Sequence, residues 1–142
     1  MGDRFEKATE CERVKLAMLI DTDGSINPTG HQRPHIKVSG RSKLPVVMWK
    51  KWGGYIGKSY LKSGKRIEYE WEINERERVR TFLRAIEPYL IIKKPQAQIA
   101  LKMIELLENK PEGYKHKLRS FAEELSRLNH APCPDIDLKR DP

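Results

Sequence analysis

Apolar residues near the start of the chain recur with a helical period, directly after a helix-start signal. Thr9 and Glu12 have the T-x-x-E spacing of a capping box, so we expect a helix to begin at about Glu10. The apolar residues among positions 14–20 lie on more than one side of this helix, which predicts burial against the protein's own core and against a second helix. Gly24 is expected to end the helix as a C-terminal glycine.

The middle of the chain alternates between polar and apolar residues, as is typical of half-buried strands. Pro28 and Gly30 suit an irregular edge strand or a turn over residues 25–31. A hairpin is predicted where two alternating segments flank a Lys-Ser-Gly-Lys sequence, and Pro45 marks the first turn of a short helix. The predicted strands cover residues 35–39, 55–61 and 66–73, and the short helix covers residues 44–52.

The rest of the chain returns to a helical period. Apolar residues at the i, i+3, i+4 and i+7 spacing predict amphipathic helices over residues 79–86, 97–107 and 118–128, the second of them after Pro95. The predicted order is αββαββα followed by further helices, which is an α+β class with strands in antiparallel hairpins. We expect a single domain over residues 1–142, with a core over about 9–110, a C-terminal helix over 114–129 and a frayed tail over 132–142.

The composition excludes several classes of protein. The chain has 142 residues, of which 38% are apolar. A chain of this size can bury one hydrophobic core without the support of disulfides or metal ions. Cys11 and Cys133 form neither a disulfide framework nor a zinc motif. No apolar run approaches the roughly 20 residues that span a bilayer, and the first residues lack the apolar stretch of a signal peptide. We therefore expect a soluble protein of a reducing compartment that is neither secreted nor membrane-bound.

The positive charge is concentrated in one part of the chain. Residues 1–66 carry 14 basic and 6 acidic residues and account for the whole net charge of +8, whereas residues 67–142 carry 14 of each. Between Gly24 and Ile67 there is no acidic residue, although there are ten Lys and Arg. A solvated surface normally mixes both signs, so this segment predicts binding to a polyanion, first of all a nucleic acid. A basic surface loop is the alternative.

Two aspartates stand at the end of the first predicted helix, where the helix dipole disfavours acids by about 0.3–1 kcal/mol. Asp21 and Asp23 therefore need a compensating cation, either a basic side chain or a metal. Main-chain carbonyls at a helix end add oxygen ligands, which suits a hard ion such as Mg²⁺. The pattern by itself leaves open that both acids are ordinary surface or capping residues.

The segment that contains these acids reads Leu-Ala-Met-Leu-Ile-Asp-Thr-Asp-Gly over residues 16–24. It resembles the LAGLIDADG motif of homing endonucleases at seven of nine positions, with Met18 in place of the third-position glycine and Thr22 in place of the seventh-position alanine. Residues 88–101 resemble the segment that precedes the family's late helix. The resemblance covers about residues 9–110 and implies the αββαββα fold with a curved, four-stranded antiparallel sheet.

What the resemblance implies is a site-specific homing endonuclease, encoded by an intron, that hydrolyses both strands of DNA. It implies that Asp23 is the catalytic acid and that it binds Mg²⁺, with Mn²⁺ or Ca²⁺ able to occupy the same site, alongside the carbonyl of Thr22. Lys93 corresponds to the family's basic residue near the scissile phosphate. Arg41 and Lys43 are expected to substitute for a polar residue that helps to hold water in the family.

The chain contains one such motif, and a single acid cannot cut two strands. The hypothesis therefore requires a homodimer, whose twofold symmetry implies a near-palindromic target. Met18 at the glycine position implies a wider contact between the paired helices, and Asp21 is expected to be structural rather than a metal ligand. The dimer interface is predicted at Leu16, Ala17, Leu19, Ile20 and Asp21.

Two predicted hairpins form a curved ribbon that fits the major groove of DNA. Arg and Lys can pair with guanine, and Glu can accept from cytosine. Three glutamates on a DNA-binding face carry an electrostatic penalty, so at least one is expected to pair with a neighbouring Lys. The predicted DNA-binding residues are Asn27, Thr29, His31, Arg33, His35, Lys37, Ser39, Arg41, Lys58, Tyr60, Lys62, Arg66, Glu68, Glu70 and Glu72.

Other interpretations of the sequence stay open. A protein of the same fold could bind nucleic acid without cutting it, as an intron RNA maturase or a transcriptional regulator, and intron RNA is then a further partner. Asp23 and Lys93 favour cleavage, because a protein that does not cut has no need of an acid at the end of a helix. His31 and His35 could form a zinc pair, but no other Cys or His ligands lie nearby in the sequence.

Overall fold

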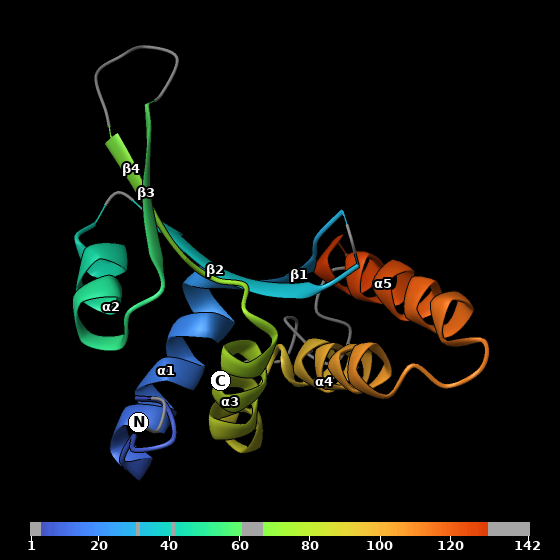
Figure 1. Cartoon of the computed structure of the whole chain (residues 1–142). Coiled ribbons are helices and arrows are strands. Elements are labelled where there is room, and N and C mark those ends of the chain that lie inside the picture. The colour runs from blue at the N-terminus through green and yellow to red at the C-terminus, as the bar shows by residue number, and fades with distance from the viewer. Residues whose placement is uncertain (1–3, 31, 41, 61–66, 131–142) are drawn as a thin grey trace, which may run out of the picture.

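The computed structural model describes residues 4–30, 32–40, 42–60 and 67–130. Its elements follow the predicted order, so the α+β class and the αββαββα arrangement are confirmed (Figure 1). The elements are α1 (Glu10–Asp23), β1 (Gly24–Pro28), β2 (Pro34–Gly40), α2 (Leu44–Trp52), β3 (Tyr55–Tyr60), β4 (Ile67–Ile73), α3 (Arg76–Ile86), the 3₁₀ turn η1 (Glu87–Tyr89), α4 (Lys94–Asn109) and α5 (Tyr114–His130).

The start of α1 forms as its capping sequence predicts. The side chain of Thr9 accepts from the main-chain N–H of Glu12, and the Glu12 carboxylate accepts from the N–H of Thr9, at 3.2 and 3.1 Å. Both bonds satisfy main-chain donors that a helix N-terminus leaves unpaired. The capping box is therefore confirmed in both directions.

The end of α1 differs from the sequence prediction. Gly24 has an extended backbone, with φ of −96° and ψ of 169°, and it is the first residue of β1. A Cβ at this position would lie 2.7 Å from the Cα of Ile20 and 2.6 Å from that side chain's terminal carbon. Glycine is therefore needed because the strand leaves the helix at close range, not because the backbone takes up a left-handed conformation.

The strands form one antiparallel sheet in the order β1-β2-β4-β3, so that β1 and β3 are its edges. Ile26 pairs with Ile36, and Val38 pairs with Trp71. Because directly opposed residues share a face, these apolar side chains all lie on one side and are fully or almost fully buried. The sheet is strongly curved, and no helix of the described residues covers its other side (Figure 1).

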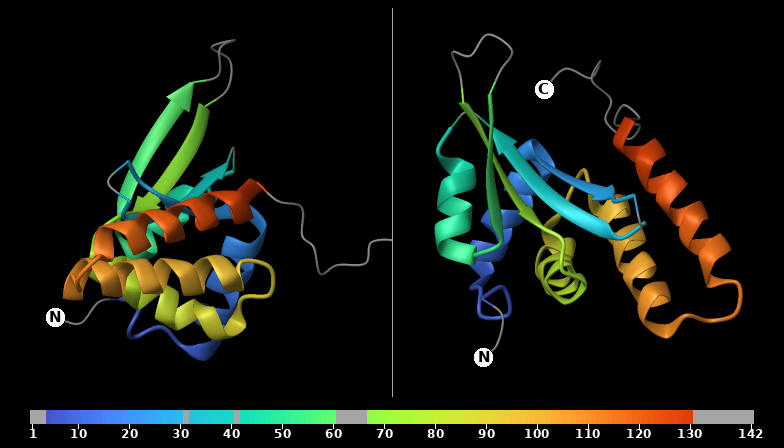
Figure 2. Two further views of the ribbon diagram at one scale, coloured as in Figure 1. Left: turned by 90° about the vertical axis from the view of Figure 1, so that its right-hand side faces the viewer. Right: turned by 45° about the horizontal axis from the view of Figure 1, so that its top comes forward.

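Helices cover the apolar side of the sheet and its two ends. In Figure 1, α1, α3 and α4 lie beneath the sheet, α2 lies beside β3 and β4, and α5 runs along β1. Figure 2 shows α4 and α5 side by side beyond this edge. An aromatic group anchors the core under the sheet: the ring of Phe5 stacks on Trp52 and meets Trp71 and Phe82 edge-on.

Within one chain, the motif helix buries one face. Leu16, Ala17 and Ile20 have 4% exposure or less within a single chain, and Leu19 is half-buried. Met18, in contrast, is 61% exposed and faces away from this core. The side chains of Leu16, Ala17 and Ile20, predicted to form a dimer interface, are therefore already covered by the protein's own core.

Some predictions concern residues outside the described ranges, namely the tip of the β3–β4 hairpin and the tail over 132–142. The C-terminal helix is present as α5, which ends at His130. None of the helices in the described residues combines the length and the apolar character that crossing a bilayer requires.

Candidate active site and nucleic-acid interface

The C-terminal end of α1 meets the loop that precedes α4, and Asp21 makes the junction. Its carboxylate accepts from the main-chain N–H groups of Ile91, Ile92 and Lys93, at 2.8, 3.2 and 2.9 Å. These donors lie in the loop that leads to Lys93, the N-cap of α4, next to the helix N-terminus, which favours a negative charge. Asp21 therefore has a structural role as an acceptor for this loop.

Lys93 also binds the end of α1, through its side-chain ammonium. Its ammonium lies 2.8 Å from the carbonyl oxygen of Ile20 and 2.5 Å from that of Gly24, with a longer contact of 3.4 Å to the carbonyl of Asp21. The last turn of α1 has no basic residue of its own. Lys93 therefore provides, from some 70 positions along the chain, the cation that favours the negative end of this helix.

Asp23 differs from Asp21 because its side chain is exposed at the point where α1 passes into β1. The hydroxyl of the neighbouring Thr22 donates to the carbonyls of Met18 and Leu19, at 2.9 and 3.2 Å, so it is turned onto its own helix. Besides this hydroxyl, Thr22 offers its main-chain carbonyl and Asp23 offers its carboxylate. Both are hard ligands of the kind that Mg²⁺ prefers.

The oxygen donors of one chain fit a divalent metal in kind but not in number. Within the described residues no group of three or more His, Cys, Asp or Glu side chains could hold a metal ion. Asp23 offers one carboxylate, whereas Mg²⁺ takes near-octahedral coordination by oxygen. A metal at this position would need further oxygen ligands from water, from a phosphate or from a second chain.

Two further residues, Lys43 and Arg41, were predicted to take part in catalysis. Lys43 is exposed immediately before α2, on a different element from Asp23 and Lys93. Arg41 falls outside the described residues. Of the predicted catalytic groups, the structure therefore brings Lys93 to the end of the motif helix.

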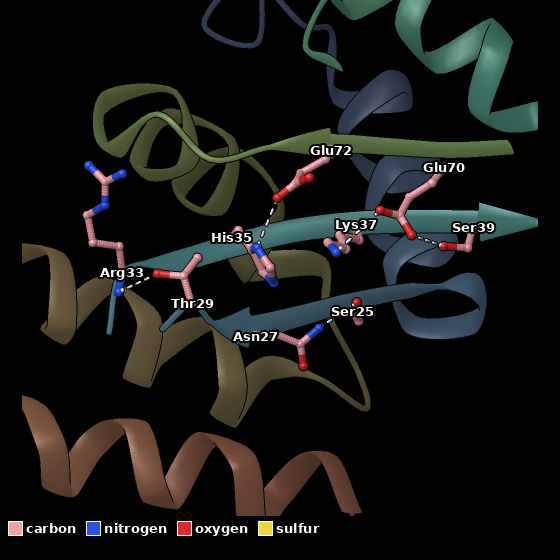
Figure 3. A network of polar contacts seen from close by, with 9 residues as sticks. All are labelled: Ser25, Asn27, Thr29, Arg33, His35, Lys37, Ser39, Glu70 and Glu72. Atoms are coloured by element: carbon pink, nitrogen blue, oxygen red, sulfur yellow. Dashed lines mark hydrogen bonds and ion pairs between the residues drawn. The ribbon is translucent and has the colours of Figure 1, made fainter. Parts of the chain in front are cut away.

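The open side of the sheet carries a row of polar side chains (Figure 3). Strand register places Asn27 opposite His35 and Ser25 opposite Lys37, so that residues of β1 and β2 share this face. The glutamates of β4 join them from the next strand, since Lys37 is opposite Glu72. The residues drawn in Figure 3 are Ser25, Asn27, Thr29, Arg33, His35, Lys37, Ser39, Glu70 and Glu72.

Basic and acidic side chains on this face pair across the strands. His35 Nδ1 lies 2.9 Å from a Glu72 oxygen, and Lys37 Nζ lies 3.3 Å from Glu70. The hydroxyl of Ser39 also donates to Glu70, at 3.2 Å. The prediction that at least one glutamate pairs with a lysine is confirmed. Because these pairs are half-buried or exposed, each contributes little to stability.

The electrostatic state of His35 follows from its position on the sheet. Burial lowers the pKa of His35 below its ordinary value of 6.5, and the positive charge of Lys37 lowers it further, while Glu72 and Glu70 act in the opposite direction. Near neutral pH the ring is therefore uncharged, and its Nδ1 proton is directed to Glu72. This bond occupies Nδ1, and His31, the other member of the conceivable zinc pair, lies outside the described residues.

The remaining predicted DNA contacts do not all lie on this face. Thr29 forms the β1–β2 turn, where its hydroxyl accepts from the N–H of Arg33, and Arg33 itself is exposed. Lys58 on β3 is exposed and lies over the ring of Tyr69, with which it pairs. This register puts Lys58 on the same side of the sheet as Trp71, so the prediction that it faces the same way as Glu68, Glu70 and Glu72 is wrong. Glu68 is half-buried on β4, and the structure describes only the main chain of Tyr60. The predicted residues His31, Arg41, Lys62 and Arg66 lie outside the described residues.

Two contributors to this face were not predicted from the sequence. Ser25 lies on the polar face beside Asn27 and accepts a hydrogen bond from it, at 2.8 Å. Asn129, near the end of α5, reaches Asn27 from more than 100 positions away. Strand alternation could have identified Ser25, since it shares the parity of Asn27, but no local pattern indicates Asn129.

The sequence matches no protein-family model, and no curated protein matches it. Solved structures do resemble the fold. The homing endonuclease I-CvuI, in complex with its target in the presence of Ca, has a TM-score of 0.72 and 22% identity over 89% of this chain and 87% of that chain. The archaeal intron-encoded homing endonuclease I-Vdi141I, complexed with DNA, has a TM-score of 0.70 and 15% identity over 92% of this chain and 91% of that chain.

A third structure resembles the chain over part of its own length. The meganuclease I-SmaMI, bound to uncleaveable DNA, has a TM-score of 0.61 and 15% identity over 78% of this chain but only 43% of that chain. Agreement at these identities concerns the fold, which also carries the LAGLIDADG-like helix where the motif predicts it. This chain therefore has the fold of the LAGLIDADG homing endonucleases.

Proposed function

We propose that the protein is a homodimeric, site-specific DNA endonuclease that depends on Mg²⁺ and is encoded by an intron. The observation that carries the proposal is the unequal use of two acids at one helix end. Asp21 is held by three main-chain N–H groups, whereas Asp23 is exposed beside the polar face of the sheet. An acid placed at the unfavourable end of a helix and left exposed is suited to binding a metal.

The residues at the end of α1 would have separate roles in this reaction. Asp23 and the carbonyl of Thr22 would hold the metal, and a bound metal supplies charge stabilisation for an in-line displacement at phosphorus. The ammonium of Lys93, within hydrogen-bond distance of the carbonyls that flank Asp23, would offset negative charge that develops on the phosphate. Lys43 stays a predicted contributor to the ordering of water.

Two copies of the chain are proposed because one copy supplies one exposed acid of the motif. Near the motif helix the surface carries uncovered apolar side chains: Met18 is 61% exposed, Ile91 83% and Ile92 39%. Asp21 holds the main chain of both isoleucines to α1, one turn beyond Met18. This surface, together with the match to about half of the I-SmaMI chain, supports pairing with a second copy through this side of α1.

The polar face of the sheet would bind the DNA. Its curvature leaves the open side facing away from the helices that form the core (Figure 1). Lys37 and His35 on β2, and Arg33 directly before this strand, can contact base edges or phosphates. Glu70 and Glu72 can accept from cytosine amino groups. Because Lys37 pairs with Glu70 and His35 pairs with Glu72 in the free protein, DNA binding would exchange these pairs for contacts with the duplex.

The proposal is tested with a randomised duplex library, incubated with the wild-type protein in the presence and in the absence of Mg²⁺, beside an Asp23→Asn variant. We expect the wild type to cut one class of near-palindromic sequences only with the metal. The variant should bind the same sequences and cut them at least about 10³-fold more slowly, since it lacks the charged metal ligand. Binding without cutting by the wild type would instead indicate a non-cleaving module, such as an RNA maturase or a transcriptional regulator.

The two-chain part of the proposal has its own test. Sedimentation of the protein on a cognate duplex should show two chains for each DNA molecule. A monomer on DNA at micromolar concentration would contradict it.

A further inference from the structure

Asn129 joins α5 to the edge strand of the sheet. Its Nδ2 lies 2.8 Å from the carbonyl oxygen of Ile26 and 2.8 Å from Oδ1 of Asn27. Nδ2 of Asn27 lies in turn 2.8 Å from Oγ of Ser25. A continuous chain of hydrogen bonds therefore runs from α5 through Asn27 to Ser25 on the polar face, where Figure 3 shows the last two.

The main-chain carbonyl at the start of this chain determines the direction of every bond in it. A carbonyl only accepts, so the atom of Asn129 that faces Ile26 must be its amide nitrogen. The same NH₂ group gives its second hydrogen to Asn27, so the Asn27 atom that faces α5 must be its oxygen. The Asn27 nitrogen is then turned towards Ser25, and the two ends of this amide are no longer interchangeable.

The consequence is a fixed polarity on the open side of β1. The Ser25 hydroxyl accepts from Asn27, which leaves its own hydrogen to be donated. The Asn27 nitrogen likewise has a second hydrogen. A freely turning asparagine offers an acceptor and a donor together, which is the pair that recognises adenine. Here the oxygen is held by α5, and two donors lie together on the side of Ser25.

We propose that Asn129 is a positioning residue that turns Asn27 and Ser25 into a donor pair and so makes β1 prefer guanine, whose N7 and O6 are both acceptors. The inference rests on the proposed function, because it requires that this face bind DNA. Asn129 acts through Asn27 and does not itself contact a base.

The first test is Asn129→Asp, which keeps the shape of the side chain but offers only acceptors. The Asn27 amide should then reverse to donate to the carboxylate, and Ser25 should donate back to the Asn27 oxygen. The pair would present acceptors to the groove and favour the amino groups of adenine N6 or cytosine N4. Selection of bound duplexes from a randomised library, without Mg²⁺, should show guanine preference falling at least about tenfold at one position in each half-site.

A second variant reaches the same polarity without altering α5. Asn27→Asp keeps an oxygen towards Asn129, so both bonds from Asn129 are retained, and it places an acceptor beside Ser25. We expect the same loss of guanine preference at the same position, with preferences elsewhere unchanged. Asn109→Asp, at the exposed end of α4, adds an equal charge away from the sheet and is the matched control that should leave the profile unchanged.

The outcomes separate this inference from the proposed function. If Asn27→Asp binds duplexes with the wild-type preference at every position, the inference is overturned while site-specific binding stands. A wild-type preference for adenine or cytosine at the affected position would also overturn it. If the wild type binds no duplex at all, both the inference and the proposed function fail. Should Asn129→Asp release α5, the Asn27→Asp profile still decides the matter.

Discussion

The junction of α1 with the start of α4 and the polar face of the sheet both bring charged groups together, but they use them differently. At the junction, Asp21 and Lys93 bond to main-chain N–H and carbonyl groups. On the sheet, Lys37 and His35 pair with the side chains of glutamates. Main-chain partners cannot leave without disturbing helices and strands, whereas side-chain pairs can be exchanged for phosphates and bases. The first arrangement therefore holds a site in place, and the second leaves a surface able to bind.

The same contrast appears within one turn of helix. Asp21 and Asp23 are two residues apart, yet the first accepts three hydrogen bonds and the second is exposed. A site that must hold a metal needs a carboxylate with free oxygen atoms on a rigid support. The Asp21 bonds provide the support for the neighbouring acid.

The largest expected effect comes from removing that support. Asp21→Ala leaves three N–H donors without their acceptor, and charge-assisted bonds make the loss about 2–4 kcal/mol in the free energy of unfolding. For a chain of this size the melting temperature should fall by roughly 5–15 °C, measured by circular dichroism. Asp23→Ala is the matched control and should change stability by less than about 0.5 kcal/mol. Equal losses in the two variants would remove the distinction between the two acids.

The second largest effect on stability is expected from removing the Lys93 ammonium. Lys93→Met removes the ammonium from the carbonyls of Ile20 and Gly24 and should cost about 1.5–3 kcal/mol of stability, measured by urea unfolding. Lys94→Met, at the following residue, should cost less than about 0.5 kcal/mol. If Lys93 also acts on the phosphate, cleavage measured on fully folded protein should fall by more than this stability loss accounts for. Unchanged stability in Lys93→Met would contradict the structural part of its role.

Substitutions in the side-chain pairs of the sheet should have the opposite effect to substitutions at the junction. We expect little change in stability and a clear change in DNA binding. Glu70→Gln releases Lys37 from its pair and should make the slope of log K against log salt steeper by about one unit. Lys37→Ala should weaken binding and flatten that slope by about one unit. Both slopes are measured by titrating a fluorescent duplex at several salt concentrations. Identical slopes in the wild type and Lys37→Ala would remove Lys37 from the set of phosphate contacts.

The smallest expected effect is a pH dependence at His35. Because burial lowers the pKa of His35 in the folded chain, the unfolded chain binds the proton more readily, and stability falls as the pH drops below the ordinary value of 6.5. In His35→Gln this part of the decline should be absent when unfolding is compared between about pH 7.5 and pH 5.5. His116→Gln, exposed on α5, should retain it. The same decline in His35→Gln and the wild type would contradict the assignment.

Much of the fold follows from local sequence patterns. The Thr9–Glu12 capping box, the alternation along β2 and β4, and the periodic helices each depend on neighbours a few residues apart, and all of them form as predicted. Gly24 shows where such reasoning fails. Its helix ends where predicted, but the reason is a close approach to Ile20 that depends on the direction in which the strand departs.

The candidate site could be predicted less completely. The sequence indicates two acids at a helix end and Lys93 as a basic partner, but not how the three divide their tasks. Leu16, Ala17 and Ile20 were predicted at an interface because an apolar helix face does not reveal which layer covers it. In the structure these three side chains pack on the protein's own core.

The sequence by itself determined the order of helices and strands, the acid-free basic segment and the motif that identifies the end of α1, because each is encoded by nearby residues. Only the tertiary structure decided that the Asp21 carboxylate accepts hydrogen bonds while Asp23 is exposed. The N–H groups that donate to Asp21 lie about 70 positions away in the sequence. The tertiary structure also decided the polarity of Asn27, through an α5 side chain more than 100 positions distant. Hydrogen bonds between remote segments depend on where folding places the donors, and no local pattern records that placement.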